Sequence, residues 1–270
     1  MTFTTYYNTE LAYVMRLEIE IIAMVNNTNV TKYTHICTCS VLTPKWTLTA
    51  RHCIDNDYNP ANRPRKTIIR PEITVNIYSV RKIVAYRPTK EPHQFHMSYV
   101  IGQAVPILRN PGLTADDIAL IETEPILLTQ YGRLSALDYD ALRYHEVTAV
   151  GYGITNYTNP NSLEPRLATT LKLQRPLQIV KGLLVECKDF QYPYMCVNQP
   201  CSQRSSICSG DSGGPVLHSS GILAVNSLAL VLNNCQMESD FFRHPKMAVV
   251  LPVSPYLNWI TGIINKKIDD

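Results

Sequence analysis

Short runs rich in Val, Ile, Thr and Tyr recur along the 270-residue chain between turn residues, whereas helical periodicity is scarce. Candidate strands cover residues 12–20, 36–42, 46–49, 67–69, 73–80, 82–86, 117–122, 146–151, 169–173, 178–180, 194–197, 215–218, 222–227 and 248–253. Many short strands at this spacing predict an all-β barrel or sandwich. The long polar stretches 55–65 and 88–111 are expected to be solvated surface loops.

The end of the chain follows a different pattern from the rest. Pro255 stands where a helix can begin, and apolar residues then recur at helical spacing, namely Tyr256, Leu257, Ile260, Ile263 and Ile264. This pattern predicts a terminal amphipathic helix that packs on the β-structure. The composition, with 45% hydrophobic and 17% charged residues, is sufficient for the chain to bury a full hydrophobic core.

Charge and cysteine content narrow the function classes. The net charge of +3 is too small to imply nucleic acid or an anionic membrane as the main partner. No apolar stretch reaches the roughly 18 residues of a membrane span. Eight cysteines and glycosylation sequons at Asn26, Asn29 and Asn156 indicate secretion. The opening segment, however, lacks the basic region and apolar run of a secretory signal.

The segment Gly-Asp-Ser-Gly-Gly-Pro at 210–215 carries the strongest chemical signal. Glycines on both sides of a serine let the backbone approach a substrate and turn its amides toward one point. Upstream, His52 directly precedes a cysteine and Asp117 opens an apolar strand, features that in isolation are more often structural. His93 and His96 lie in a long loop without further ligand-type residues at metal-site spacing, so we expect solvated histidines and no metal.

The chain order His, Asp, Ser together with the glycine-rich serine loop resembles the trypsin and chymotrypsin family of serine endopeptidases. Residues 37–42 resemble the strand that opens the first barrel, 46–53 the histidine segment, 151–153 the corner between barrels and 257–260 the closing helix. The resemblance implies a single peptidase domain of two six-stranded antiparallel Greek-key β-barrels, at 12–135 and 136–252, followed by a helix at 253–267.

The resemblance also implies the role of each site residue. Ser212 would be the nucleophile that forms an acyl-enzyme, His52 its general base and acid, and Asp117 the group that orients the imidazole. The amides of Gly210 and Ser212 would form the oxyanion hole. No metal or organic cofactor is needed.

The protein is expected to be a secreted monomer that acts on proteins or peptides and binds protease inhibitors, without nucleic acid or membrane partners.

The resemblance implies four residues that determine which substrate side chain is bound. Ser206, six residues before the nucleophile, would form the pocket floor, where an aspartate would select Arg or Lys; a neutral floor favours apolar substrate side chains. Ser227 resembles the strand residue that binds substrate backbone. Ala229 and Ala248 would narrow the pocket toward small or medium residues. This alignment crosses insertions at 230–234 and 236–244, so a large aromatic residue also stays open.

The resemblance assigns six cysteines to three disulfides, Cys37 with Cys53, Cys187 with Cys196, and Cys208 with Cys235. Two cysteines remain, Cys39 and Cys201. They have three alternatives, since they can pair with each other, stay free, or bridge to a segment outside this sequence.

Activation is where the sequence departs from the family pattern. Family members are cut to expose an Ile-Val-Gly-Gly-like terminus, whose amine pairs with the aspartate before the nucleophile, here Asp211. No such cleavage site occurs, and we expect the sequence to lack its signal, propeptide and first mature residues; a cut after Arg16 is the less favoured alternative.

The sequence leaves two alternative functions. A catalytically silent homologue that binds or regulates other proteins is supported only by the missing terminus. A lipase or esterase is excluded because its triad has another chain order.

Overall fold

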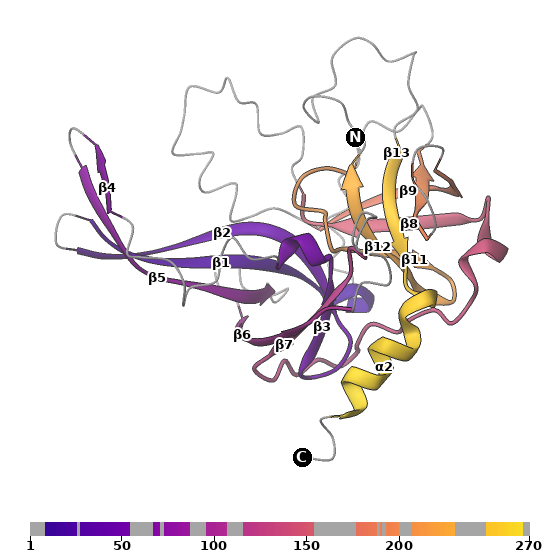
Figure 1. Cartoon of the computed structure of the whole chain (residues 1–270), viewed down its shortest axis with the longest axis horizontal. Coiled ribbons are helices and arrows are strands. Elements are labelled where there is room, and N and C mark those ends of the chain that lie inside the picture. The colour runs from indigo at the N-terminus through magenta and orange to yellow at the C-terminus, as the bar shows by residue number, and fades with distance from the viewer. Residues whose placement is uncertain are drawn as a thin grey trace, which may run out of the picture.

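The computed structural model describes residues 9–25, 28–54, 67–70, 73–86, 96–106, 116–153, 177–187, 190, 193–199, 207–229 and 247–266. Within these ranges the chain forms two antiparallel β-sheets and one C-terminal α-helix (Figure 1). The sequence-based prediction of an all-β, two-barrel protein closed by a helix is therefore confirmed.

The first sheet has the strand order β1-β2-β3-β7-β6-β5-β4. Its strands are β1 (Val14–Val25), β2 (Thr28–Val41), β3 (Trp46–Thr49), β4 (Thr67–Arg70), β5 (Ile73–Tyr86), β6 (His96–Ala104) and β7 (Ala119–Thr123). Because β1 also pairs with β5, six of these strands form a continuous ring of pairings, and β4 is an addition on the outer edge of β5. Figure 1 shows β1, β2 and β5 running out of the barrel as a long ribbon with β4 at its far end.

The second sheet closes into a barrel with the order β10-β13-β12-β11-β8-β9. Its strands are β8 (Glu146–Gly151), β9 (Gln178–Glu186), β10 (Met195–Asn198), β11 (Pro215–His218), β12 (Gly221–Ala229) and β13 (Met247–Pro252). The short 3-10 helices are η1 (Thr9–Leu11), η2 (Arg51–Cys53), η3 (Tyr139–Leu142) and η4 (Ser254–Tyr256), and η4 leads into α2 (Leu257–Lys266).

The strand predictions succeed best for three short strands of four to six residues. The bounds of β3, β8 and β11 agree with the predicted 46–49, 146–151 and 215–218. The stretch 88–111 was wrongly predicted to be loop throughout, because β6 lies inside it. A register shift between Val100 and Gly102 breaks the two-residue alternation by which a strand is recognised. The predicted strand at 169–173 lies outside the described residues.

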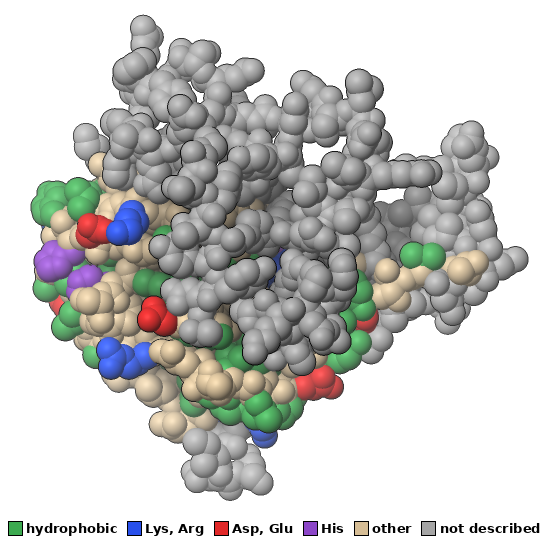
Figure 2. Space-filling model, turned by 180° about the vertical axis from the view of Figure 1, so that it is seen from behind, with side chains coloured by type: hydrophobic (Ala, Val, Ile, Leu, Met, Phe, Trp, Pro, Cys, Tyr) green, Lys and Arg blue, Asp and Glu red, His purple; other side chains and the backbone are tan. Residues whose placement is uncertain are grey.

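One hydrophobic core joins both sheets and the helix. Leu17 and Leu120 from the first sheet, Val225 and Leu251 from the second, and Ile260 from α2 belong to the same buried cluster. A second cluster fills the closed barrel. Figure 2 shows the described acidic and basic side chains scattered over one face rather than gathered in a patch of one sign. None of the described helices is long and apolar enough to cross a membrane.

Candidate active site

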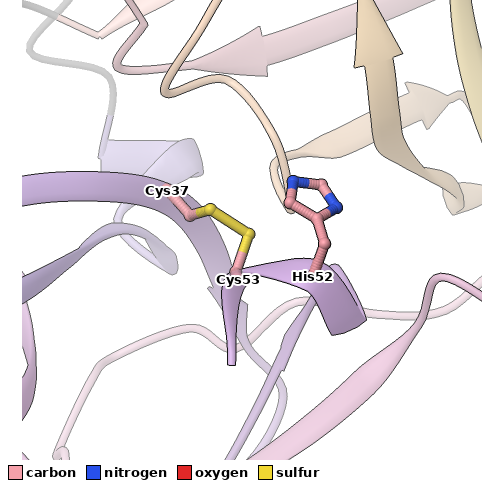
Figure 3. A group of neighbouring side chains, drawn as sticks. All are labelled: Cys37, His52 and Cys53. Atoms are coloured by element: carbon pink, nitrogen blue, oxygen red, sulfur yellow. A yellow bond between two sulfur atoms is a disulfide. The ribbon is translucent and has the colours of Figure 1, made fainter. Parts of the chain in front are cut away.

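His52 is held in place by a disulfide. It lies on η2, directly after β3, and its neighbour Cys53 is bonded to Cys37 on β2, 16 residues away in the sequence. Figure 3 shows the imidazole standing beside this bridge. Potential ligand atoms of Cys37, His52 and Cys53 lie within 4.8 Å of one another. Since the two sulfurs are joined as a disulfide, they do not offer the thiolates that a metal site requires.

Asp117 accepts hydrogen bonds from two directions. The His52 ring donates from Nδ1 to Oδ2 at 2.8 Å, and the His52 backbone N–H donates to Oδ1 at 2.9 Å. The Ser227 hydroxyl donates to Oδ2 at 2.5 Å. A carboxylate only accepts, so the Nδ1 nitrogen carries the proton and the lone pair of a neutral ring is at Nε2.

The environment of Asp117 keeps its carboxyl group ionised. Burial raises the pKa of Asp117, but the hydrogen bonds and charge of His52, together with the Ser227 hydroxyl, outweigh burial and lower the pKa below its usual value. The side chain of Asp117 is 12% exposed, against 43% for His52. The pair therefore combines a shielded, permanent negative charge with an accessible imidazole.

Ser212 is connected to the Asp117–His52 pair by hydrogen bonds through Ser227. The Ser212 hydroxyl donates to the Ser227 carbonyl at 3.5 Å, and the side chain of the same Ser227 binds Asp117. The flanking glycines have the left-handed backbone that other residues rarely adopt, with φ of 96° at Gly210 and 80° at Gly213. The structure thus pairs His52 directly with Asp117, 65 positions away, and connects Ser212 to Asp117 through Ser227.

The backbone amides of the serine loop divide into two groups. Those of Asp211, Gly213 and Gly214 donate to carbonyls of the protein at 2.8–3.0 Å. Those of Gly210 and Ser212 donate to no residue in the described part of the chain. Within the described residues these two amides of one tight loop have no acceptor, so they are available to bind one on a substrate.

Asp211, which lies between them in the sequence, is buried. Its carboxylate accepts from the amides of Gly153 at 2.7 Å and Cys208 at 2.9 Å. A Cβ atom added at Gly153 would lie 2.7 Å from a carboxylate oxygen, and one at Gly151 would lie 3.0 Å from the Asp211 Cα. The glycines of the predicted corner therefore make room for this carboxylate.

The sequence profile of the family described as Trypsin matches residues 17–260, which is most of the chain. The chain belongs to the trypsin family of serine proteases. Venom peptide isomerase heavy chain from Agelenopsis aperta is 24% identical over 243 residues, which cover 85% of this chain and 88% of the relative. Granzyme M from Homo sapiens is 23% identical over 255 residues, with 86% and 81% covered.

The structure of HL collagenase superposes with a TM-score of 0.59 at 20% identity, covering 96% of this chain and 95% of the other. At this identity the likeness supports the chymotrypsin-like fold alone. Membership of the trypsin family therefore rests on the sequence profile, and the site is argued from its own geometry.

The predicted specificity residues of this trypsin-family chain are only partly described. Ser206 lies outside the described residues. Ala229 on β12 pairs directly with Ala248 on β13. Ala248 is 1% exposed and packs in the core of the closed barrel. Their function as pocket walls stays a prediction, whereas Ser227 has a contact to Asp117 that the sequence did not indicate.

Two of the three disulfides are present as predicted, Cys37–Cys53 and Cys187–Cys196. Cys208 is disulfide-bonded, and its predicted partner Cys235 lies outside the described residues, as does Cys201. Cys39 is a buried free thiol that donates to the Met15 carbonyl at 3.5 Å. Burial raises the pKa of Cys39, so it stays protonated. Of the three alternatives for Cys39, the structure therefore has the free state.

Of the predicted glycosylation sites and loop histidines, only Asn29 and His96 are among the described residues. Asn29 lies in β2 opposite Met24, whereas Asn26 and Asn156 are outside the described residues. His96 begins β6 and is therefore not in a loop, and His93 is not described.

Two tyrosines near the aspartate were not recognised from the sequence. The Tyr256 hydroxyl donates to Asp116 at 2.6 Å, so the turn before α2 anchors the segment that carries Asp117. Tyr194 lies close to Asp117, and burial together with that negative charge raises the pKa of Tyr194 to about 12. Tyr256 was assigned only to the apolar face of the helix, and nothing local in the sequence distinguished either hydroxyl.

Proposed function

We propose that this chain is a secreted serine endopeptidase that hydrolyses peptide bonds through an acyl-enzyme. The observation that carries the proposal is the chain of hydrogen bonds from Ser212 through Ser227 and Asp117 to His52. Beside it lie two loop amides that have no acceptor in the part of the chain that the structure describes. Membership of the trypsin family supports it. The disulfides support an extracellular location, because such bonds persist in oxidising compartments.

The proposed reaction follows from the proton positions. With Nδ1–H held by Asp117, the Nε2 lone pair of His52 takes the proton of the Ser212 hydroxyl as its oxygen attacks the peptide carbonyl. The resulting oxyanion is stabilised by the amides of Gly210 and Ser212. The imidazolium, stabilised by ionised Asp117, then protonates the leaving amine. Water then gives a proton to Nε2 as its oxygen attacks the acyl carbonyl. The imidazolium returns that proton to the Ser212 oxygen as the ester bond breaks and the carboxylic acid product leaves.

The proposed substrates are proteins and peptides, cut after apolar side chains of small to medium size rather than after Arg or Lys. A neutral Ser206 in the pocket floor supports the exclusion of a cationic side chain, since a buried cation there would lack a partner. Protease inhibitors are also proposed partners, because membership of the trypsin family supports both protein substrates and inhibitors. Asp211 is proposed to pair with a terminal amine on activation.

The test is covalent labelling with a fluorophosphonate probe, which reports an activated serine. We expect the folded chain, or a form extended with an Ile-Val-Gly-Gly terminus, to be labelled at Ser212, and Ser212→Ala to remain unlabelled. Mass spectrometry of the labelled peptide identifies the serine. If both forms are folded and neither reacts, the endopeptidase proposal is overturned and a silent homologue that binds or regulates becomes the better account.

A further inference from the structure

Thr38 on β2 of the first sheet contacts the serine loop of the second sheet through its side chain and its backbone. It is fully buried, with no exposed surface. Its hydroxyl donates to the Gly210 carbonyl at 2.8 Å and accepts from the Tyr152 amide at 3.0 Å. Its own amide donates to the Ser212 carbonyl at 2.8 Å. A single residue therefore binds both carbonyls that flank Asp211.

These bonds have a consequence for the loop amides. With the carbonyls of Gly210 and Ser212 both directed at Thr38, the two peptide planes that follow these residues cannot turn freely. The amides within those planes belong to Asp211 and Gly213, and both are paired inside the protein. The amides of Gly210 and Ser212, which have no acceptor among the described residues, lie on either side of Asp211 in the same loop. Their direction therefore depends on the peptide planes that Thr38 holds.

Thr38 is itself fixed from the opposite side. The Thr49 hydroxyl on β3 donates to the Thr38 carbonyl at 3.0 Å, so the backbone of Thr38 is bonded on both sides. The ring of His35, also on β2, lies with Nε2 at 3.1 Å from the Gly210 carbonyl, which therefore has two partners on one strand. The attachment of the loop is thus built into the strand.

We propose that Thr38 is a positioning residue for the oxyanion hole, which holds the Gly210 and Ser212 amides in their productive direction from the opposite sheet. The inference rests on the proposed function, because an oxyanion hole has a meaning only if Ser212 reacts. It goes beyond that function by making strand β2, and not only the loop, responsible for the stabilisation of the transition state.

The test uses two matched substitutions at one position. Thr38→Val keeps the shape and removes the hydroxyl, while Thr38→Ser keeps the hydroxyl and removes the methyl group. Thr47→Val is the control for burial, because Thr47 on β3 is also fully buried and its hydroxyl has no partner within the described residues. Each protein is reacted with a fluorophosphonate at several concentrations, which separates the maximal rate of labelling from the probe concentration at half-maximum.

We expect Thr38→Val to lower the maximal labelling rate by about 10- to 100-fold, less than or comparable to the loss of an oxyanion donor itself. The half-maximal probe concentration should stay within about twofold, since ground-state binding does not use the oxyanion amides. Thr38→Ser should restore most of the rate, and Thr47→Val should react like the wild type. A purely structural effect would instead follow the melting temperature and would not be rescued by serine.

Amide hydrogen exchange across residues 207–214 gives a readout that does not depend on activity. We expect faster exchange in this segment for Thr38→Val than for Thr38→Ser. If the wild type is not labelled but exchange responds in this way, the endopeptidase proposal fails while the attachment of the loop by Thr38 stands. If Thr38→Val is labelled at the wild-type rate, or if serine does not rescue it, the positioning proposal is overturned.

Discussion

Ser227 connects the proposed nucleophile Ser212 to Asp117 by hydrogen bonds. Its carbonyl accepts from Ser212 and its hydroxyl donates to Asp117, so it contacts two of the proposed catalytic residues at once. It is 3% exposed, which shields both bonds from water. A hydrogen bond to a charged acceptor in such a place contributes more than one between neutral groups.

Replacing Ser227 by alanine should lower the free energy of unfolding at pH 7 by about 1.5–3 kcal/mol, because ionised Asp117 loses a donor. The pKa of Asp117 is lowered in the folded protein, partly by this hydroxyl. A lowered carboxyl pKa stabilises the fold above the unfolded pKa of about 3.9, and this stability is lost as the pH falls through the folded pKa. The difference between wild type and Ser227→Ala should therefore shrink below about pH 4.

Urea unfolding at pH 7 and at pH 3 measures this difference. Ser40→Ala is the matched control, since Ser40 is 1% exposed and its hydroxyl has no partner within the described residues. Its effect should not change with pH between these values. A Ser227→Ala effect that is equally large at pH 3 would contradict the role assigned to the Asp117 carboxylate.

At the scale of elements, η2 depends on the strand beside it. This short helix carries His52 but makes only one turn, so its own hydrogen bonds cannot fix its position. The Cys37–Cys53 disulfide supplies the attachment to β2, the strand that also carries Thr38. Both His52 and the serine loop are thus positioned from one strand.

Replacing Cys37 and Cys53 together by alanine should lower the free energy of unfolding by about 3 kcal/mol, the amount expected for a loop of this length. The rate of fluorophosphonate labelling per folded molecule should also fall, because η2 loses its attachment. The Cys187→Ala, Cys196→Ala double variant is the control. It removes the other disulfide, which closes a separation of 9 residues on the second barrel. Equal labelling rates in the two double variants would refute a positioning effect of Cys37–Cys53.

At the scale of the whole molecule, the two sheets share one core. The main buried cluster includes residues from both sheets and from α2, and Ile260 of the helix has no exposed surface. Unfolding of either half would therefore expose side chains of the shared cluster in the other half, although the closed barrel also has a cluster of its own. We therefore expect the two barrels to unfold together.

Ile260→Ala tests this coupling. It should lower the free energy of unfolding by about 2–5 kcal/mol, since a fully buried side chain is replaced by a cavity. Far-ultraviolet and near-ultraviolet circular dichroism should report one common transition at a lower denaturant concentration. Asn258→Ala, on the exposed side of α2, should change stability little. Two separated transitions in the Ile260→Ala variant would argue against a shared core.

The strands that the sequence predicted well share a physical property. β3, β8 and β11 are short, and each places buried residues in a hydrophobic cluster, so local sequence pattern and final structure agree. The sequence predicts two strands, 73–80 and 82–86, where the structure has the single strand β5. In the sheet Arg81 and Lys82 pair with Glu20 and Ile19 of β1, so the partner strand determines that the strand continues there.

The sequence by itself determined the fold class, the family and the order of His52, Asp117 and Ser212, because strand periodicity and the glycine-rich loop are local properties of the chain. The connections among those residues were decided only by the tertiary structure. Ser227 beside Asp117, Thr38 beneath the serine loop and the free thiol of Cys39 all depend on which strands become neighbours. Contacts across two sheets join positions far apart in the sequence, and no local pattern specifies their distance.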